Sequence, residues 1–281
     1  MTRQGDRGVT LLFVLVILAL CSGVVVAMVT VSESSVRRTR MYDEAVAAGA
    51  LVAAGETTAV IALRRDLLTG PDLDHAEEPW ARTNQAEVAI ADGRFSLTLT
   101  DAQGLYNLTN LGTEGVLAQQ RLADIVTALD LKADLRASII AAAPARLDNL
   151  RAVMSSDDLA KFATMVTILP QATDVNINAA PAALLAVLLN NKVQARLLVA
   201  RRAKLGFVTP DDVASLGIIL PAGIAYRSSF FDVTVTAQVG ETVVTEQALI
   251  ARQMQSQGKP RAAVVARRPG GKMAAEFPLP P

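Results

Sequence analysis

The chain has 281 residues, enough for one large domain or two modest ones. Its 27 basic and 27 acidic residues give zero net charge, which argues against a large electrostatic surface for nucleic acid. The single cysteine, Cys21, cannot form an internal disulfide, and one Cys with one His excludes a zinc cluster of the finger kind.

The N-terminal region contains a long apolar segment. From Gly8 to Ser32 there are 25 residues without a charge. As a helix at ~1.5 Å per residue, residues 9–31 would be about 35 Å long, enough to cross a bilayer core. A cleavable secretory signal has an apolar region of only about 7–15 residues. We therefore expect residues 9–31 to be a retained transmembrane helix. Arginines flank it on both sides, so charge alone leaves its orientation open.

The helix is expected to continue beyond the membrane, over residues 32–69. The segment from Glu33 to Leu68 contains no proline and is rich in good helix formers. Gly70 and Pro71 then form a plausible stop signal. One long helix is therefore predicted, with its first half in lipid and its second half in solution.

An acidic loop follows, from Gly70 to Trp80. Its side chains could in principle bind a metal: Asp72, Asp74, His75, Glu77 and Glu78. The favoured interpretation is a solvated loop without a metal, because nothing in the sequence fixes the geometry that a site needs.

Two segments have the alternation of β-strands. Ala86 to Thr100 contains two short alternating runs around Asp92-Gly93, a favoured hairpin turn. Phe230 to Arg252 contains a second pair of runs around Gly240-Glu241. Both patterns fit half-buried antiparallel strands.

About a hundred residues between these strands have helical periodicity. Two apolar faces are interpreted as core: Leu122, Ile125, Val126 and Leu129, and then Leu131, Leu135 and Ile139. The predicted fold is α+β, with the first part of an antiparallel sheet in residues 70–111, a helical insertion in 112–227 and the final strands in 228–252. Residues 253–281 lack periodicity and are expected to be disordered.

The N-terminus resembles the type IV prepilin class. Residues 1–8 form a charged leader that ends in Arg7-Gly8, directly before the apolar helix VTLLFVLVILAL. In that class a membrane peptidase cuts after the glycine and methylates the new N-terminus. The resemblance implies that Gly8 precedes the cut and that Val9 is the first mature residue.

The fifth mature position departs from the class. Most members have Glu there, whereas this chain has Phe13. A carboxylate at that depth is costly unless it pairs with a neighbouring subunit's terminal amine. Among pseudopilins, omission of this Glu marks the K-type minor pseudopilins of type II secretion, which are thought to lie at the pseudopilus tip.

Two internal motifs are similar to the same family. The segment from Met165 to Leu189 has the family's Asn-x-Asn-small-Ala-Pro pattern, and Asp101 to Leu111 resembles its Asp-x-x-Gly-x-x-Asn sequence, with Thr109 in place of a usual Asn. The matching positions are Asp101, Gly104, Asn107, Asn176, Asn178, Ala180 and Pro181. We expect Asn178 to cap a helix that starts at Ala179.

The resemblance covers roughly residues 1–250 and implies a function. It implies a non-enzymatic tip subunit that helps to initiate and cap the pseudopilus for protein export across the outer membrane. The chain would cross the bacterial inner membrane once, with its soluble domain in the periplasm. Implied partners are the I-type and J-type minor pseudopilins, the major pseudopilin and the prepilin peptidase, with no nucleic acid. Calcium is associated with the family, but residues 131–150 lack its tryptophan and several of its carboxylates, so no ligands are matched.

Two alternative functions remain open. The all-α insertion is expected to be SAM-like or helix-hairpin-helix-like. Within it, residues 176–216 resemble a helix-hairpin-helix domain of membrane-anchored competence proteins, which bind DNA. The usual Gly-x-Gly hairpin is replaced here by Leu189 to Lys192, and a solvated helix face is the favoured interpretation of the nearby basic residues Arg196, Arg201, Arg202 and Lys204. A minor type IV pilin is the other alternative. An enzyme has little support, because the sequence contains no nucleophile motif such as G-x-S-x-G.

Overall fold

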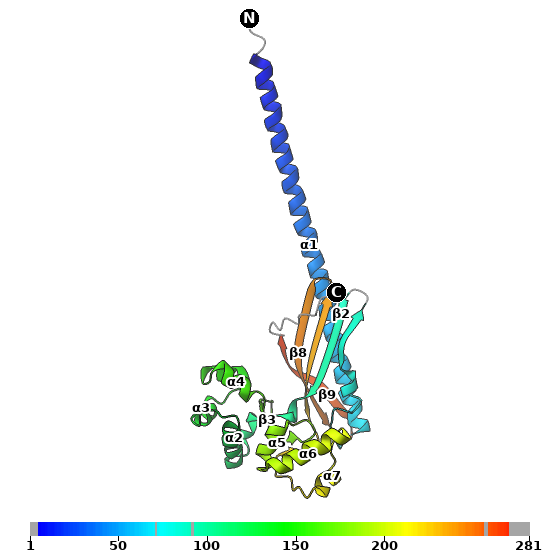
Figure 1. Cartoon of the computed structure of the whole chain (residues 1–281). Helices are drawn as coiled ribbons and strands as arrows, with labels where there is room; N and C mark the ends of the chain where they lie inside the picture. The colour runs from blue at the N-terminus through cyan, green and yellow to red at the C-terminus, as the bar shows by residue number, and fades with distance from the viewer. Residues whose placement is uncertain (1–4, 71, 91–92, 256–257, 270–281) are drawn as a thin grey trace.

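The computed structural model describes residues 5–70, 72–90, 93–255 and 258–269. Helix α1 (Gly5–Thr69) has 65 residues and is therefore roughly 100 Å long at ~1.5 Å per residue. It projects far beyond the rest of the molecule, and only its last part lies against the sheet (Figure 1). The predicted continuation to residue 69 is confirmed, and the helix ends directly before Gly70.

A five-stranded antiparallel sheet has the order β1-β2-β7-β8-β9. Its strands are β1 (Gln85–Ile90), β2 (Gly93–Asp101), β7 (Phe230–Val239), β8 (Thr242–Met254) and β9 (Pro260–Pro269). Both predicted strand pairs are confirmed: β1 pairs with β2, and β7 with β8. Because β2 lies beside β7, the insertion leaves the sheet and returns to it between adjacent strands.

The predicted disorder of residues 253–281 is wrong for part of that segment. Strand β8 continues to Met254, and residues 260–269 form β9, which pairs with β8 along most of its length. Ala262 and Val264 pack against the sheet core. The sequence pattern missed this strand because an edge strand is held mainly by backbone hydrogen bonds, which leave little trace in side-chain alternation. Residues 270–281 lie outside the described residues.

The second half of α1 packs on one face of the sheet. Its buried residues include Ala48, Val52, Ala59 and Leu63, which meet the core-facing side chains of the strands. The helix approaches the sheet closely at Gly55, where a Cβ atom would lie 2.8 Å from Cγ1 of Val235. A larger residue there would push α1 away from the sheet.

The insertion is built of short helices and short parallel strand pairs. Its helices are α2 (Val116–Ala128), α3 (Leu135–Ala142), α4 (Ser156–Phe162), α5 (Ala182–Leu188), α6 (Lys192–Leu205) and α7 (Pro210–Ser215). Short strand β3 (Tyr106–Asn107) pairs with β4 (Val166–Thr167), and β5 (Val175–Asn176) with β6 (Ile224–Ala225). Its 3₁₀ turns are η2 (Ala102–Gly104), η3 (Leu108–Gly112) and η4 (Leu147–Ala152), whereas a further turn, η1 (Ala81–Thr83), precedes β1.

This insertion has its own hydrophobic core, separate from the core between α1 and the sheet. Both predicted apolar faces contribute to it, with Leu122 and Ile125 of α2 and Ile139 of α3 fully buried. A small third cluster, which includes Ala102 and Phe230, lies where the chain passes between the two parts. The fold is therefore α+β, with a helical insertion in an antiparallel sheet.

Candidate functional site

The first functional feature is the exposed half of α1. Every residue from Leu11 to Asp43 is exposed, and the segment from Leu11 to Val31 is almost wholly apolar. Among the described residues, α1 is the one helix long and apolar enough to cross a membrane. Gly8 and Val9 lie in its first two turns, and the Phe13 side chain is exposed. This arrangement is consistent with a single membrane anchor.

The second feature is a polar network at the joint between sheet and insertion. Asp101 ends β2, and its Oδ2 accepts hydrogen bonds from Asn176 Nδ2 at 2.7 Å and from Ser228 Oγ at 2.6 Å. Asn176 Nδ2 also donates to the Asp74 carbonyl at 3.0 Å. Two motif residues that are 75 positions apart therefore meet. Ser228, two residues before β7, contacts both of them, so the network holds the point where the chain leaves the sheet against the point where it returns.

Two other motif positions make close contacts within the same joint. A Cβ atom at Gly104 would lie 2.9 Å from the carbonyl oxygen of Ala179, so glycine allows the two motifs to touch. Asn107 is fully buried, donates to the Gln171 carbonyl at 2.7 Å and accepts from the Leu169 backbone N–H at 3.0 Å. Both residues therefore allow the segment after β2 to contact the backbone of residues 169–179.

The predicted helix cap at Asn178 is wrong. Helix α5 begins three residues later than the predicted start, and its N-cap residue is Pro181. Asn178 instead exchanges two hydrogen bonds with the backbone of Val208, its Oδ1 accepting at 2.9 Å and its Nδ2 donating at 3.2 Å. The buried backbone N–H and C=O of Val208 require hydrogen-bond partners, and Asn178 supplies both of them instead of capping a helix. Ala180 is fully buried, and its carbonyl accepts from Arg202.

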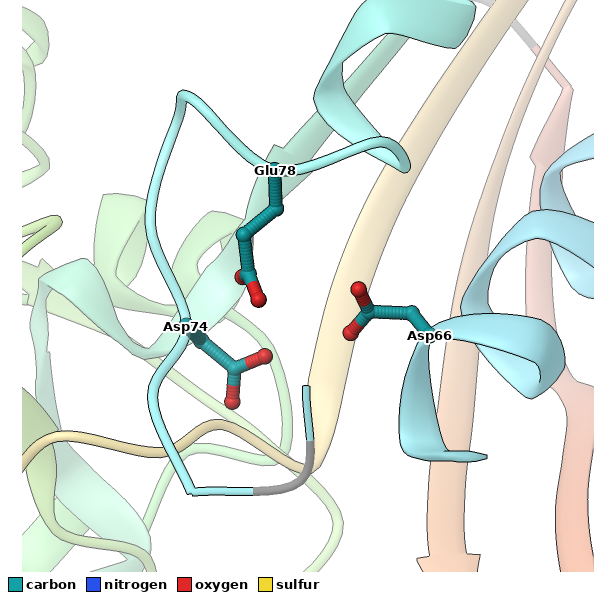
Figure 2. A group of neighbouring side chains, drawn as sticks. All are labelled: Asp66, Asp74 and Glu78. Atoms are coloured by element: carbon teal, nitrogen blue, oxygen red, sulfur yellow. The ribbon is translucent and has the colours of Figure 1, made fainter. Parts of the chain in front are cut away.

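A third feature is a group of buried carboxylates beside this joint. Asp66 comes from the last turn of α1, and Asp74 and Glu78 come from the loop that follows it. Figure 2 shows the three side chains directed toward one another. One ligand-type oxygen from each lies within 4.8 Å of the others. The Asp66 and Asp74 side chains are each only 1% exposed.

Arg252 supplies a positive charge to this group. This residue of β8 is 3% exposed and forms ion pairs with Asp66 and Asp74. Its Nε donates to the Ser228 carbonyl at 3.2 Å, and its guanidinium lies 4.4 Å from the centre of the Phe231 ring. Arg252 therefore ties the end of α1 and the acidic loop to the sheet.

Burial shifts the pKa values of these groups. Burial raises the pKa of Glu78 to about 7, although hydrogen bonds from Trp80 and from the His75 backbone oppose the shift. Burial also raises the pKa of Asp66 against the opposing effect of Arg252. The pKa of Asp101 is raised to about 6 by burial, with hydrogen bonds from Ser228 and other donors opposing it. Keeping all of these carboxylates ionised is therefore costly.

The solvated-loop interpretation of residues 70–80 is wrong for Asp74 and Glu78, which are buried, whereas Asp72 and Glu77 are exposed as expected. Sequence reasoning also missed Asp66 and Arg252. A signal for both was present. Arg252 follows Ala248 and Ile250 on the core-facing side of a strand, and Asp66 follows Leu63 on the buried face of α1. A charge on each of two facing core positions predicts a buried ion pair.

Of the four basic residues of α6 singled out by the sequence, Arg201 and Arg202 make internal contacts, whereas Arg196 and Lys204 are exposed. Arg201 pairs with Asp212 at 2.7 Å, and Arg202 donates to two backbone carbonyls of the Asn176–Pro181 motif region. At the α5–α6 turn, Asn191 Oδ1 accepts from the backbone N–H groups of Val193 and Gln194. These are the amides that a helix N-terminus would offer to a phosphate. The arrangement therefore gives little support to the DNA-binding alternative.

Comparison with known proteins gives two findings, and no family model matches the chain. The type II secretion system protein K of Klebsiella pneumoniae is 34% identical over 116 residues, which are 39% of this chain and 33% of that protein. The aligned segment thus spans about a third of the length of this relative.

The fold is matched much more extensively. A chain in the crystal structure of the GspK–GspI–GspJ complex, from the type 2 secretion system of enterotoxigenic Escherichia coli, aligns with a TM-score of 0.65 and 21% identity. The alignment covers 83% of this chain and 99% of that one. The chain is therefore similar in sequence, over part of its length, to a type II secretion system protein K, and similar in fold, over most of its length, to a chain of the GspK–GspI–GspJ complex.

Proposed function

We propose that this chain is a minor pseudopilin of a type II secretion system, of the K type, and that it acts as a non-enzymatic subunit at the pseudopilus tip. The observation that carries the proposal is the architecture of the chain. An exposed apolar half-helix continues into a helix packed on an antiparallel sheet, and a large helical insertion interrupts that sheet. The partial sequence similarity and the fold match support the same assignment.

The proposed mechanism is mechanical. The apolar half of α1 holds the subunit in the bacterial inner membrane, with the head in the periplasm, and later packs among the helices of neighbouring subunits. Phe13 offers no carboxylate to a neighbour's terminal amine, so the subunit does not depend on that pairing. The insertion makes the head bulky on one side. Such a head fits a terminal position better than burial within a helical filament.

The proposed partners are subunits of the I and J types, together with the major pseudopilin. The matched crystal structure contains GspI and GspJ, and the aligned chain is covered over 99% of its length. Their contacts with the present chain would initiate and cap the pseudopilus. The α5–α6 pair, with its helix-hairpin-helix-like connection, serves in this proposal as a packing element of the insertion, since Arg201, Arg202 and the amides of its turn are used internally.

The proposal predicts removal of residues 1–8 by a prepilin peptidase. The full chain is co-expressed with and without the peptidase, and the N-terminus is determined by mass spectrometry. We expect a chain that starts at a methylated Val9 when the peptidase is present. Gly8→Ala should block cleavage, whereas Gly5→Ala, a glycine change in the same leader, should not. Retention of residues 1–8 in the presence of active peptidase would refute the proposal.

A second experiment tests assembly directly. The full chain in detergent is mixed with I-type and J-type subunits, and complex formation is followed by size-exclusion chromatography. We expect a stable complex that contains all three. A complex with duplex DNA that weakens steeply with salt, and no complex with the subunits, would instead support the competence-type alternative.

A further inference from the structure

We propose that a hollow between α1 and the turn of the β7–β8 hairpin binds the phosphoethanolamine headgroup of a membrane phospholipid. The hollow lies where α1 leaves the head of the molecule (Figure 1). Its volume is about 350 Å³, and the polar side chains that line it are Glu33, Arg37, Arg40, Glu44 and Glu241. The inference rests on the membrane anchor of the proposed function and is independent of the partners proposed above.

The position of the hollow along α1 matches the headgroup layer of a bilayer. The apolar segment ends at Val31, and α1 continues as an unbroken helix through Arg40. At ~1.5 Å per residue, Arg37 lies about 9 Å and Arg40 about 14 Å beyond Val31. The headgroup layer adds roughly 5–8 Å on each side of the hydrocarbon core. Because helix side chains lean toward the N-terminus, both arginines extend back toward the lipid phosphates.

Two arginines supply hydrogen-bond donors for a phosphate. The Arg37 side chain is exposed and forms no ion pair or hydrogen bond within the described part of the chain. Arg40 Nε donates to Glu44 Oε1 at 2.9 Å, which orients this side chain, yet the side chain remains 74% exposed. Residues three apart lie on one face of a helix, and guanidinium groups bind phosphate oxygens strongly. Arg37 and Arg40 can therefore bind the same phosphate.

The opposite wall of the hollow is held against α1 by Glu44. Its Oε2 accepts from the Glu241 backbone N–H and from Thr242 Oγ1, each at 3.1 Å. Glu44 is only 8% exposed, although it is a charged residue on the first part of α1 to meet the sheet. Gly240 permits this approach, because a Cβ atom there would collide with the Glu44 carboxylate. The hollow is therefore preformed between a helix and a turn that is tied to it.

The charges that line the hollow favour a zwitterionic headgroup. Arg37 and Arg40 face three carboxylates, and of these Glu44 is paired with Arg40. The side chains of Glu33 and Glu241 are exposed and have no ion pair among the described residues. An anionic headgroup would be repelled by these two carboxylates, whereas phosphoethanolamine offers them an ammonium group with three N–H donors. A choline headgroup has no N–H and cannot form those hydrogen bonds.

The distribution of arginines around the apolar segment supports the same assignment. Arg3 and Arg7 precede the segment, and Arg37, Arg38 and Arg40 follow it. Membrane proteins usually carry an excess of basic residues near the membrane on the cytoplasmic side. In the proposed orientation this chain has more of them on the opposite side, so topology does not account for them. Contact with lipid phosphates gives Arg37 and Arg40 a role at this position.

Native mass spectrometry tests the lipid and the residues that bind it. The full chain in detergent is mixed with equal amounts of phosphatidylethanolamine, phosphatidylglycerol and phosphatidylcholine, and the lipids that remain bound are identified by mass. We expect phosphatidylethanolamine to be retained roughly fivefold more than either of the others. Arg37→Gln should abolish this preference, whereas Arg38→Gln, an exposed neighbour outside the hollow, should preserve it. Glu241→Gln should shift retention toward phosphatidylglycerol. Equal retention of the three lipids by the wild type, or a preference for phosphatidylglycerol, would overturn the inference.

Hydrogen exchange tests whether the lipid joins the hairpin turn to α1. The full chain is placed in nanodiscs of phosphatidylcholine, with or without phosphatidylethanolamine, and exchange of the backbone amides of residues 239–242 is measured. We expect exchange to be roughly threefold slower with phosphatidylethanolamine, since a bound headgroup stabilises the closed turn. Arg37→Gln should exchange at the same rate in both nanodiscs, and Arg38→Gln should behave as the wild type does. Soluble O-phosphoethanolamine at about 1 mM should give no protection in phosphatidylcholine nanodiscs. Protection by this soluble compound, or identical wild-type rates in the two nanodiscs, would overturn the inference.

Discussion

Replacement of Arg252 by methionine is the sharpest test of the buried joint. Methionine fills a similar volume, so the change removes the charge and the hydrogen bonds while creating little cavity. Asp66 and Asp74, each 1% exposed, then lose their common counter-charge, and the Ser228 carbonyl loses a donor. Removing one partner of a buried ion pair typically costs about 3–5 kcal/mol. For a domain of this size we expect a fall in melting temperature of roughly 6–20 °C.

The assay is thermal and urea unfolding of the full chain in detergent with EDTA present, followed by the fluorescence of Trp80. A double-mutant cycle with Asp66→Asn isolates the pair, and we expect a coupling of about 0.5–3 kcal/mol.

Burial already raises the pKa of Asp66, and loss of the opposing effect of Arg252 raises it further. The carboxylate therefore becomes protonated as the pH falls, and the cost of its unpaired charge disappears. The deficit of Arg252→Met should shrink between pH 7 and pH 4.

Two results would refute this reasoning. One is an unfolding free energy of Arg252→Met within about 1 kcal/mol of the wild type, since truncating a buried pair costs several times that amount. The other is zero coupling with Asp66→Asn, which would mean that the ion pair contributes nothing at this position.

Three further predictions concern the pH dependence, the motif and the helix–sheet core. Because the pKa of Glu78 is raised from 4.5 to about 7 on folding, its stabilising contribution is fully present below about pH 4.5 and is lost as the pH rises through 7. In EDTA, Glu78→Gln should therefore gain stability relative to the wild type between pH 5 and pH 7, as measured by urea unfolding at each pH. If the difference in unfolding free energy between the two proteins stayed the same over this range, the raised pKa of Glu78 would be contradicted. Asn176→Ala removes a buried amide whose Nδ2 lies within hydrogen-bond distance of three acceptors, and it should cost about 2–4 kcal/mol in urea unfolding. Asn191→Ala, at an exposed helix cap, should cost only about 1 kcal/mol. Leu63→Ala, on the buried face of α1, should lower the unfolding free energy by about 2–5 kcal/mol. Its control is Ile61→Ala, because Ile61 is 55% exposed, and this change should alter the unfolding free energy by less than about 0.5 kcal/mol. Equal effects of the two changes would show that α1 does not pack on the sheet as described.

The local elements of this protein could be predicted from its sequence because their signals are local. The proline-free run before Gly70 predicted the end of α1, and the alternation around Gly240 predicted β7 and β8. The apolar stripes that contain Leu122 and Ile139 predicted helices of the insertion core. In each of these cases the side chains of neighbouring residues determine which face is buried, so the pattern and the structure have the same period.

The polar joint could be predicted only in part. Asp101 and Asn176 were singled out by family resemblance, yet nothing local indicates that their side chains meet across 75 residues. Asn178 has the residue type of a helix cap and a proline three positions later, but it is used to satisfy the backbone of Val208. Strand β9 was missed because its edge position depends on the backbone of β8 rather than on its own side chains.

The sequence by itself determined the long apolar helix, the two strand pairs on either side of a helical insertion, and the α+β class, since each follows from periodicity over a short window. Only the tertiary structure decided which charged residues around the joint are buried. Asp66, Asp74, Glu78 and Arg252 are drawn from three separate segments, and as isolated charges each would be expected at the surface. Packing α1, the acidic loop and β8 together pairs Asp66 and Asp74 with Arg252, and it gives Glu78 hydrogen bonds from Trp80 and the His75 backbone instead. A charged side chain leaves water only when folding supplies such partners.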